Sequence, residues 1–254
     1  IFFLTVAVFT IISCGGPKVI VNYRSNAEQA ELTGDYEKAV TAWQSHFQKQ
    51  LEEDANIEGA EYARAAKVAY QAEMKQQAVD WFEQARYKDY ADEDMYIILA
   101  DIFESRDNVS KELEALEYYV NNFESEDMEV NKRLFEIYYT IDMNEKALAV
   151  LERIPNDSIT SEGMIEKYFL INKEAENDEV TDSVSLVLLE KNPKHVQALE
   201  WNATKYYWKA ENRYRREMKK YEQNKTGLQY VFLKKELKQV TADFKKALSY
   251  FEKL

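Results

Sequence analysis

The stretch Gly34-Asp35-Tyr36-Glu37-Lys38-Ala39, followed by Trp43 and Phe47, decides the fold of this 254-residue chain. Glycine and aspartate favour a turn. After them, an alanine and two large apolar residues recur at every fourth position, which predicts an amphipathic helix that starts at the turn. Residues 23–30 carry a second apolar stripe of helical spacing. The sequence therefore predicts a pair of helices joined by a tight turn.

The pair resembles one tetratricopeptide (TPR) repeat. In that family a glycine turn, an aromatic residue and an alanine lead into a large apolar residue four positions on. The first stripe here consists of Tyr23, Ala27 and Ala30, and its small residues allow two helices to approach closely. The resemblance implies a helix-turn-helix unit that stacks on further units of the same kind.

Three further units follow with the same pattern. Their stripes are Tyr62, Ala66 and Ala69 with Ala78, Phe82 and Ala85; Tyr96, Ala100 and Phe103 with Ala115 and Tyr119; and Leu134, Phe135 and Tyr138 with Ala147, Leu151 and Ile154. The second-helix alanines at 39, 78, 115 and 147 lie 39, 37 and 32 residues apart, near the family period of about 34. We interpret residues 52–54 and 89–94 as loop insertions in the early repeats. A fifth, weaker unit spans 164–193, and a helical bundle with accidental spacing is the alternative.

The last unit, residues 195–254, differs from the others. Its second-helix signature at 243–247 comes late, after a helical pattern that is interrupted only at 224–227. We expect a hairpin of two helices of roughly 27 residues, each about 40 Å long. Their facing stripes predict an antiparallel coiled coil: Ala203, Tyr207, Ala210, Tyr214, Met218 and Tyr221 oppose Tyr230, Leu233, Leu237, Val240, Phe244, Ala247, Phe251 and Leu254. The fold class is thus all-α, a TPR-like α-solenoid with a long C-terminal coiled-coil helical hairpin.

Composition supports a helical chain without disulfides. Only 6 Gly and 3 Pro occur, and there is a single cysteine. The net charge of −13 argues against nucleic acid as a partner. Residues 195–254 nevertheless carry 14 Lys and Arg against 7 Asp and Glu, so the terminal hairpin is basic and the preceding chain is acidic.

The N-terminal residues set the expected compartment. Residues 1–13 are uncharged and too few to span a bilayer, which needs about 20 apolar residues. They are typical of the core of a secretory signal whose start precedes Ile1. Residues 11–14, Ile-Ile-Ser-Cys, resemble a bacterial lipobox, which implies cleavage before Cys14 and lipid attached to its thiol; the alternative is an ordinary signal peptide with an incidental cysteine. We expect domains at 1–13 (signal peptide), 14–20 (lipidated tether), 21–194 (repeat array) and 195–254 (hairpin).

Catalytic and metal sites are not expected. The two histidines, His46 and His195, are 149 residues apart, and Cys14 is expected to carry lipid. We therefore predict a packed or surface histidine at 46, a turn residue at 195, no His/Cys metal set and no cofactor. Phosphate loops and hydrolase motifs are absent from the sequence. Ser158 and Ser183 lie in tripeptides that resemble bacterial O-glycosylation acceptors, although surface serines are the first interpretation.

Two surfaces are candidates for binding. The resemblance to TPR proteins implies a concave face lined by the first helices, and its positions carried over to this chain are Arg24, Glu28, Lys67, Tyr70, Asp101, Lys132, Glu136, Tyr139, Thr204 and Tyr207. The second surface is the basic hairpin, with Lys209, Arg213, Arg216, Lys220, Lys234 and Lys238. Anionic headgroups or an acidic protein would suit it, and the alternative is a solvated outer face of the coiled coil.

These features favour a non-catalytic, lipid-anchored scaffold for protein–protein interactions in the bacterial cell envelope. No acidic residue follows Cys14 closely. In this respect the chain resembles lipoproteins that are sent to the outer membrane and face the periplasm. Envelope proteins or peptides are then the expected partners. The sharper hypothesis is an accessory subunit of an outer-membrane assembly or secretion complex. The alternative is a binding module for a peptide or glycan, with Tyr70, Tyr139 and Tyr207 as its platform.

Overall fold

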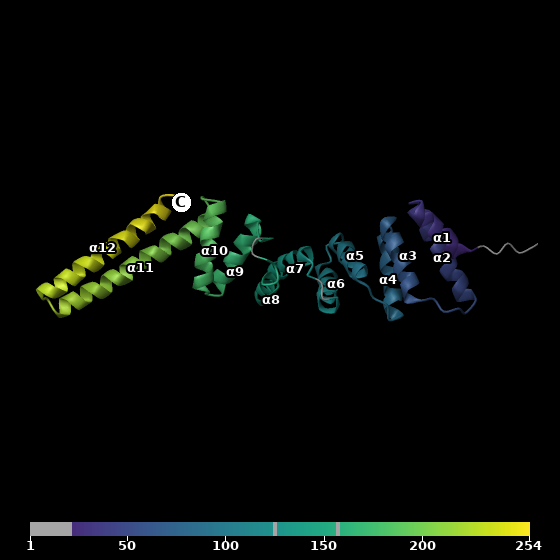
Figure 1. Ribbon diagram of the computed structural model, residues 1–254, viewed down its shortest axis with the longest axis horizontal. Coiled ribbons are helices and arrows are strands. Elements are labelled where there is room, and N and C mark those ends of the chain that lie inside the picture. Colours follow the sequence, from purple (N-terminus) through teal and green to yellow (C-terminus); the bar gives the residue numbers. More distant parts are fainter. Residues whose placement is uncertain (1–21, 124–125, 156–157) are drawn as a thin grey trace, which may run out of the picture. The chain divides into compact units, whose positions relative to one another are not determined.

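The computed structural model describes residues 22–123, 126–155 and 158–254 (Figure 1). Cys14 and the predicted signal and tether lie outside these residues. Across the described ranges the chain forms twelve α-helices and no strand, and consecutive helices pair as hairpins. The predicted all-α array of helical hairpins is confirmed. The chain divides into two compact units, residues 1–124 and 125–254.

Each unit contains three hairpins. In unit 1 they are α1 (Tyr23–Leu32) with α2 (Tyr36–Glu52), α3 (Gly59–Gln71) with α4 (Lys75–Tyr87), and α5 (Glu93–Glu104) with α6 (Val109–Asn122). In unit 2 they are α7 (Met128–Thr140) with α8 (Asn144–Leu151), α9 (Glu162–Glu174) with α10 (Asp178–Lys191), and α11 (Val196–Gln223) with α12 (Gly227–Phe251).

Five of the hairpins share one turn. In the first, Gly34 has a φ of 74°, and the amide of Asp35 donates to the carbonyl of Ala30 at 2.9 Å. Glycine reaches this left-handed conformation without a steric cost. The next four hairpins place a non-glycine residue there, with φ between 53° and 59°. These residues are Glu73, Asp107, Asp142 and Glu176.

Aromatic side chains join the first two hairpins of unit 1. Trp43 is fully buried, and Phe47 of α2 lies 4.5 Å from Tyr62 of α3 and 5.5 Å from Trp81 of α4 between ring centroids. The small residues of α3, such as Ala66, are also fully buried, so α3 is covered on more than one side. The predicted stripes of the first four units lie in the core, apart from Tyr23.

The extra length of the first repeat is partly helical. α2 has 17 residues, four more than α4, and it runs to Glu52. We predicted residues 52–54 as a loop insertion, so the first of them belongs to the helix instead. In residues 89–94, likewise, Asp92 caps α5 by accepting a hydrogen bond from the amide of Met95, and Glu93 and Asp94 form the first turn of that helix.

A compact core holds the fifth hairpin against α11 in unit 2. Phe169 of α9 and Leu188 of α10 are fully buried and cluster with Ala198 of α11. The Trp201 indole donates from Nε1 to Oδ1 of Asp182 at 3.0 Å. Asn202 donates to the hydroxyl of Ser185 at 2.9 Å. The early part of α11 is therefore fixed to α10.

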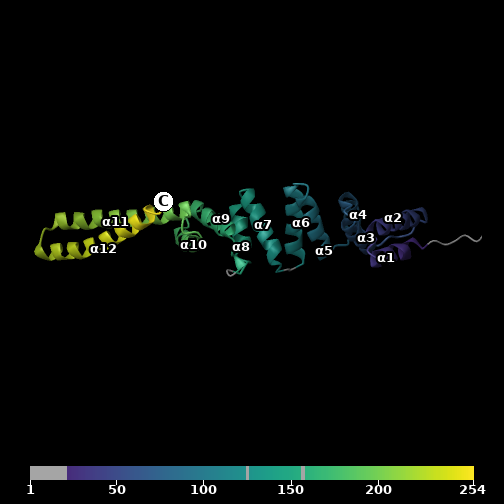
Figure 2. The same cartoon turned by 90° about the horizontal axis from the view of Figure 1, so that it is seen from above.

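The last hairpin is long, as predicted, with 28 residues in α11 and 25 in α12. Its helices lie side by side in both views (Figures 1 and 2). Leu233, Val240 and Ala247 are buried in the seam between them. The seam closes less completely than predicted, because Tyr207 and Tyr214 are each 40% exposed. Alanine at 203 and 210 fits between the closely spaced helices, whereas the larger tyrosine rings lie at the edge.

None of the helices in the described ranges is long and apolar enough to cross a membrane.

Candidate partner-binding surfaces

The first helices of unit 1 bring the predicted binding residues onto one polar surface, which we call the first-helix face. It consists of Arg24, Glu28 and Glu31 of α1, Glu61, Arg64, Lys67 and Tyr70 of α3, Asp92 at the start of α5, and Asp94 and Asp101 of α5. Helical spacing explains the grouping, because residues three, four or seven apart share one side of a helix.

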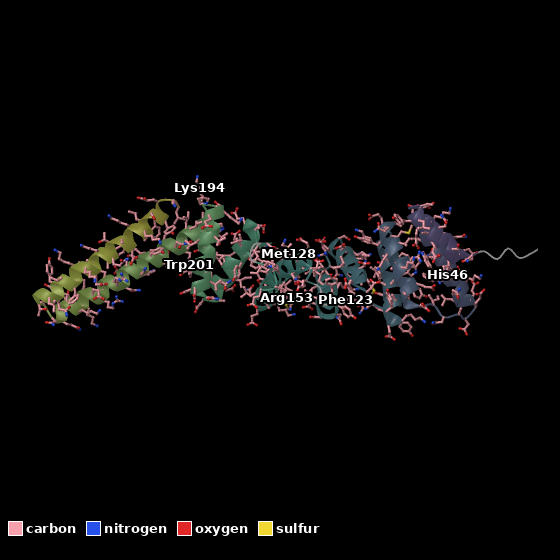
Figure 3. The ribbon with its side chains drawn as sticks, in the orientation of Figure 1. His46, Phe123, Met128, Arg153, Lys194 and Trp201 are labelled. Atoms are coloured by element: carbon pink, nitrogen blue, oxygen red, sulfur yellow. The ribbon has the colours of Figure 1, made fainter. Side chains whose placement is uncertain are left out.

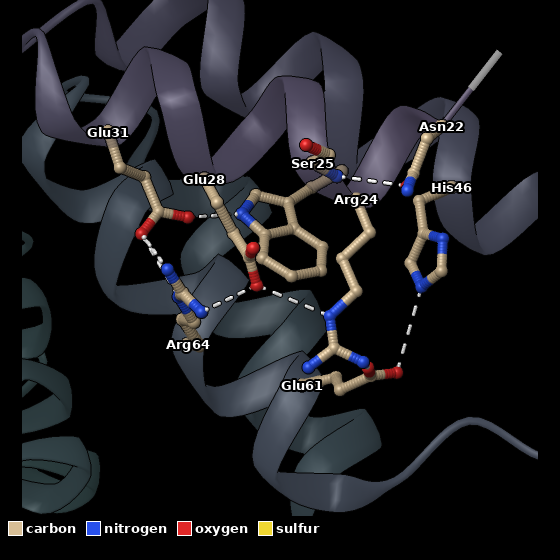
Figure 4. Close-up of polar contacts among 9 residues, drawn as sticks. Asn22, Arg24, Ser25, Glu28, Glu31, His46, Glu61 and Arg64 are labelled. Atoms are coloured by element: carbon tan, nitrogen blue, oxygen red, sulfur yellow. Dashed lines mark hydrogen bonds and ion pairs between the residues drawn. The ribbon is translucent and has the colours of Figure 1, made fainter.

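Two arginines connect α1 to α3 (Figure 4). Arg64 and Arg24 both contact Oε1 of Glu28, at 3.0 Å and 3.3 Å respectively. Arg24 also lies 2.5 Å from Glu61, and Arg64 lies 2.9 Å from Glu31. The carboxylate of Glu28 thus sits between two guanidinium groups. This arrangement aligns neighbouring repeats, and exposed pairs of this kind contribute about 0.2–1 kcal/mol each.

Glu31 links this surface to the core. Its Oε1 accepts a 2.6 Å hydrogen bond from the indole of Trp43, and the guanidinium of Arg64 lies 5.7 Å from the centre of that ring. Sequence analysis missed Glu31, Glu61 and Arg64. The repeat pattern gave no signal for them, because equivalent positions of the first two repeats are 39 residues apart, whereas the paired Glu31 and Arg64 are 33 residues apart.

α5, the first helix of the third hairpin, continues the same pattern of contacts with α3. Lys67 lies 3.1 Å from Asp92 and 2.8 Å from Asp94. Partial burial lowers the pKa of Lys67, but hydrogen bonds to Asp94 and Asp92 outweigh it and raise that pKa above its usual value. The Tyr70 hydroxyl donates to Asp101 at 3.4 Å. All five residues predicted for the binding face of unit 1 therefore take part in polar contacts across it.

The first-helix face carries an excess of negative charge. It holds three basic side chains and six carboxylates. The ion pairs neutralise only part of the acidic charge, so the field at this surface attracts cations. A basic segment of a partner has the complementary charge.

Both histidines make structural contacts. His46 is buried on α2 beside Trp43 and Phe47, and its Nε2 lies 3.7 Å from Glu61 (Figures 3 and 4). His195 caps α11, because its Nδ1 accepts a hydrogen bond from the amide of Ala198 at 3.3 Å. Among the described residues, no group of three or more His, Cys, Asp and Glu side chains could hold a metal ion.

The binding residues predicted on α7 divide into two groups, because Glu136 and Tyr139 both contact Lys167 of α9, whereas Lys132 pairs within its own helix. Lys132 pairs with Glu129 of its own helix at 2.8 Å, and Glu136 pairs with Lys167 of α9. The ammonium of Lys167 lies 5.5 Å from the centre of the Tyr139 ring.

On α11, Thr204 is exposed and lines a shallow pocket with Asp178 and Trp201. Tyr207 packs at the edge of the hairpin, 5.6 Å from Phe244. The structure places Tyr70 in one unit and Tyr139 and Tyr207 in the other, on different helices.

The basic hairpin neutralises part of its own charge. Lys209 lies 3.4 Å from one oxygen of Asp243, and Arg213 lies 3.9 Å from the other. Asp243 is buried, and sequence analysis identified it only as part of a helix signature.

Nearer the turn, Arg216 and Lys220 hydrogen-bond to Glu217 at 2.7 Å and 2.9 Å and lower the pKa of that carboxyl group. Lys234 lies 5.7 Å from the centre of the Tyr230 ring, and Lys238 is exposed.

A small cavity that the sequence did not predict lies in unit 1. Its volume is about 120 Å³, and its lining includes Tyr96, Leu99 and Phe103 of α5 with Tyr118 of α6. The rings of Tyr96 and Tyr118 stack with 4.0 Å between centroids. Burial, with a further contribution from Tyr118, raises the pKa of Tyr96.

Comparison with known proteins gives distant resemblances of fold. No protein-family model matches the sequence, and no curated protein matches it. Among solved structures, the chain is similar to YrrB, described as a TPR protein with an unusual peptide-binding site, at 19% identity and a TM-score of 0.49 over 70% of this chain and 89% of that one.

Two further solved structures cover more of the chain. A tetratricopeptide repeat protein from Parabacteroides merdae matches at 16% identity and a TM-score of 0.46 over 90% of this chain and 91% of that one. A TPR repeats protein from Bacteroides fragilis matches at 15% identity and a TM-score of 0.39 over 91% and 88%. At these values the fold assignment rests on the hairpins of the chain itself.

Proposed function

We propose that this protein is a non-catalytic, TPR-like scaffold that binds a basic segment of a partner protein on the first-helix face of unit 1. The observation that carries the proposal is the excess of carboxylates on that face, where six acidic and three basic side chains take part in neighbouring polar contacts. Repeat arrays use such surfaces to bind extended peptides or helices. The mutual ion pairs keep the side chains ordered before a partner binds, which reduces the entropy lost on binding.

We further propose that lipid on Cys14 anchors the scaffold in the bacterial cell envelope, on the periplasmic side of the outer membrane. Support comes from the lipobox-like residues 11–14 and from the absence of an acidic residue among the next four. In this setting the partner is an envelope protein, and an accessory role in an outer-membrane assembly or secretion complex is the specific form of the proposal.

Site-specific photocrosslinking in cells tests the binding face. Ala60 and Gln71 are exposed on α3 and share its side with Arg64 and Lys67. A photoreactive amino acid at either position should crosslink to one defined partner, identified by mass spectrometry. Crosslinkers at the exposed positions Asp80 and Gln84 of α4 are the matched controls and should not capture that partner. Equal capture from both helices would reject the first-helix face as the binding surface.

The charge argument has its own test with purified proteins. Replacing Asp94 and Glu28 by their amides (Asp94→Asn and Glu28→Gln) should weaken binding of the crosslinked partner and reduce its dependence on salt. Glu83→Gln on α4 is the control for lost negative charge and should leave the affinity unchanged. A partner that binds all three variants equally would show that the carboxylates do not select it.

The lipid anchor is tested separately. The wild-type chain should incorporate labelled fatty acid and partition into the detergent phase, and Cys14→Ser should do neither. Membrane fractionation of the wild-type protein then locates it. A wild-type chain without incorporated lipid would exclude the anchor but leave the binding face untouched, so the two parts of the proposal fail independently.

A further inference from the structure

The first turns of α12 carry an exposed apolar cluster, which we call the tip cluster. It consists of Leu228, Val231 and Phe232, which are 67%, 64% and 55% exposed. Their spacing of three and four residues places them on one side of the helix. Tyr230 is half exposed on a neighbouring side, where its ring lies 6.0 Å from that of Tyr221 in α11. The helix is therefore apolar on more than one side at this end.

Positive charge surrounds the tip cluster. Residues 219–238, which include the turn, contain six Lys and two Glu. One of the six, Lys220, pairs with Glu217, which lies just before this range. Lys234 and Lys235 follow the cluster directly and are exposed. An apolar centre inside a basic border is complementary to an anionic lipid surface, with phosphates outside and hydrocarbon beneath.

The tip lies away from the contacts that hold the hairpin in unit 2. The hydrogen bonds and ion pairs of α10 to α11 involve Trp201, Asn202 and Lys205. From Lys205 the helix continues for 18 residues to Gln223, about 27 Å at 1.5 Å per residue. Figures 1 and 2 show the turn at the end of the hairpin farthest from α10. The tip can thus meet a flat surface without moving the helices of the core.

We propose that the tip of the α11–α12 hairpin docks on a membrane surface rich in anionic lipid. The tip cluster inserts at the boundary between headgroups and acyl chains, and the flanking lysines contact lipid phosphates. A helix that docks in a protein groove needs a single apolar stripe, whereas apolar residues around the helix, tyrosines and flanking lysines are typical of the membrane interface. The proposal goes beyond scaffolding and does not depend on Cys14.

A local fluorescence measurement tests the docking. In the full chain with Cys14→Ser, the only cysteine is one introduced as Leu228→Cys and labelled with an environment-sensitive dye. Vesicles of phosphatidylcholine with phosphatidylglycerol should shift its emission to the blue, and pure phosphatidylcholine should shift it much less. A dye at Tyr87→Cys is the matched control, because Tyr87 is 80% exposed at the end of α4. Because the dye reports its own surroundings, apolar residues 1–13 do not produce the signal at the tip.

Variants separate the apolar from the electrostatic contribution. Val231→Ser with Phe232→Ser should weaken the partitioning of the protein onto the anionic vesicles by at least about tenfold, because both side chains lose apolar burial in the lipid. Lys234→Gln and Lys235→Gln should each weaken it by about fivefold, and high salt should act in the same direction. The similarly exposed Leu32→Ser with Tyr87→Ser in unit 1 should change nothing. Circular dichroism establishes that each variant remains helical.

Several outcomes would overturn the proposal. One is no shift at position 228 on anionic vesicles, and another is an equal shift at positions 228 and 87. A shift that rises with protein concentration in the absence of vesicles would identify a second copy of the chain as the occupant instead. None of these results bears on partner binding by the first-helix face, which is measured without membranes.

Discussion

The α3–α4 hairpin and the α11–α12 hairpin have the same topology but opposite distributions of burial. Seven of the 13 residues of α3 are buried, against five of the 28 residues of α11. α3 is covered by its partner helix and by neighbouring hairpins, whereas the seam with α12 is the main contact along most of α11. In a repeat array, stability comes largely from contacts between neighbours. The short hairpins therefore carry stability, and the long hairpin presents surface.

The strongest test of this difference removes one aromatic ring from each hairpin. Phe82 of α4 is fully buried, so Phe82→Ala should destabilise unit 1 by about 3–5 kcal/mol. Phe244 of α12 is only partly buried, and Phe244→Ala should cost less than about 2 kcal/mol. Hydrogen exchange followed by mass spectrometry reports the loss of protection in each helix. Equal losses would show that the long hairpin is as tightly packed as the repeats.

A matched pair of glycines probes the same contrast through added volume. Gly59 and Gly227 both occupy the first position of a helix, in α3 and α12. A Cβ on Gly59 would lie 2.4 Å from the Cβ of Tyr90, so Gly59→Ala should destabilise unit 1 by about 1–3 kcal/mol. A Cβ on Gly227 meets nothing within 4 Å, and Gly227→Ala should stabilise the hairpin by about 0.5–1 kcal/mol. Urea unfolding measures both, and a cost at Gly227 would contradict the open packing at the turn.

The apolar spacing of the sequence was enough to predict the hairpins, but the glycine turn was not. Only the first hairpin has glycine at its left-handed position, and Glu73 and Asp107 occupy the equivalent positions in the next two. Helix packing holds these residues at positive φ, so the turn persists after its sequence signal is lost. The buried alanines, such as Ala78 and Ala115, kept the pattern recognisable because a larger residue would separate the paired helices.

The candidate site was predictable only in part, for a related reason. Helical spacing placed Arg24, Glu28 and Lys67 on first helices, and the structure finds each of them in polar contacts that join neighbouring first helices. Their partners depend on the angle between adjacent hairpins, which no local pattern encodes. Asp243 was missed because its ion pairs are with Lys209 and Arg213, some 30 residues earlier on another helix.

The buried carboxylate of the long hairpin allows a test with a smaller effect. Asp243 pairs loosely with Lys209 and Arg213, and both of these cations are partly exposed. Because a well-packed apolar residue is often at least as stabilising as a buried ion pair, Asp243→Leu should stabilise the hairpin by about 1 kcal/mol. Thermal unfolding measures the change. Destabilisation instead would mean that Asp243 fixes the alignment of the two helices, and the hairpin would then depend on polar contacts as unit 1 depends on apolar ones.

The smallest expected effect concerns acidification. The pKa of Glu217 is lowered in the folded protein by its hydrogen bonds to Arg216 and Lys220. Its contribution to stability is therefore fully present above the unfolded value of 4.5 and is lost as the pH falls through the folded pKa. Glu217→Gln should cost about 0.5 kcal/mol at neutral pH and nothing in strong acid, because surface pairs are weak. Unfolding of both proteins along a pH series measures the difference. A difference that persists below the folded pKa would show that Glu217 stabilises α11 by packing. The long hairpin would then resemble the short hairpins in the source of its stability.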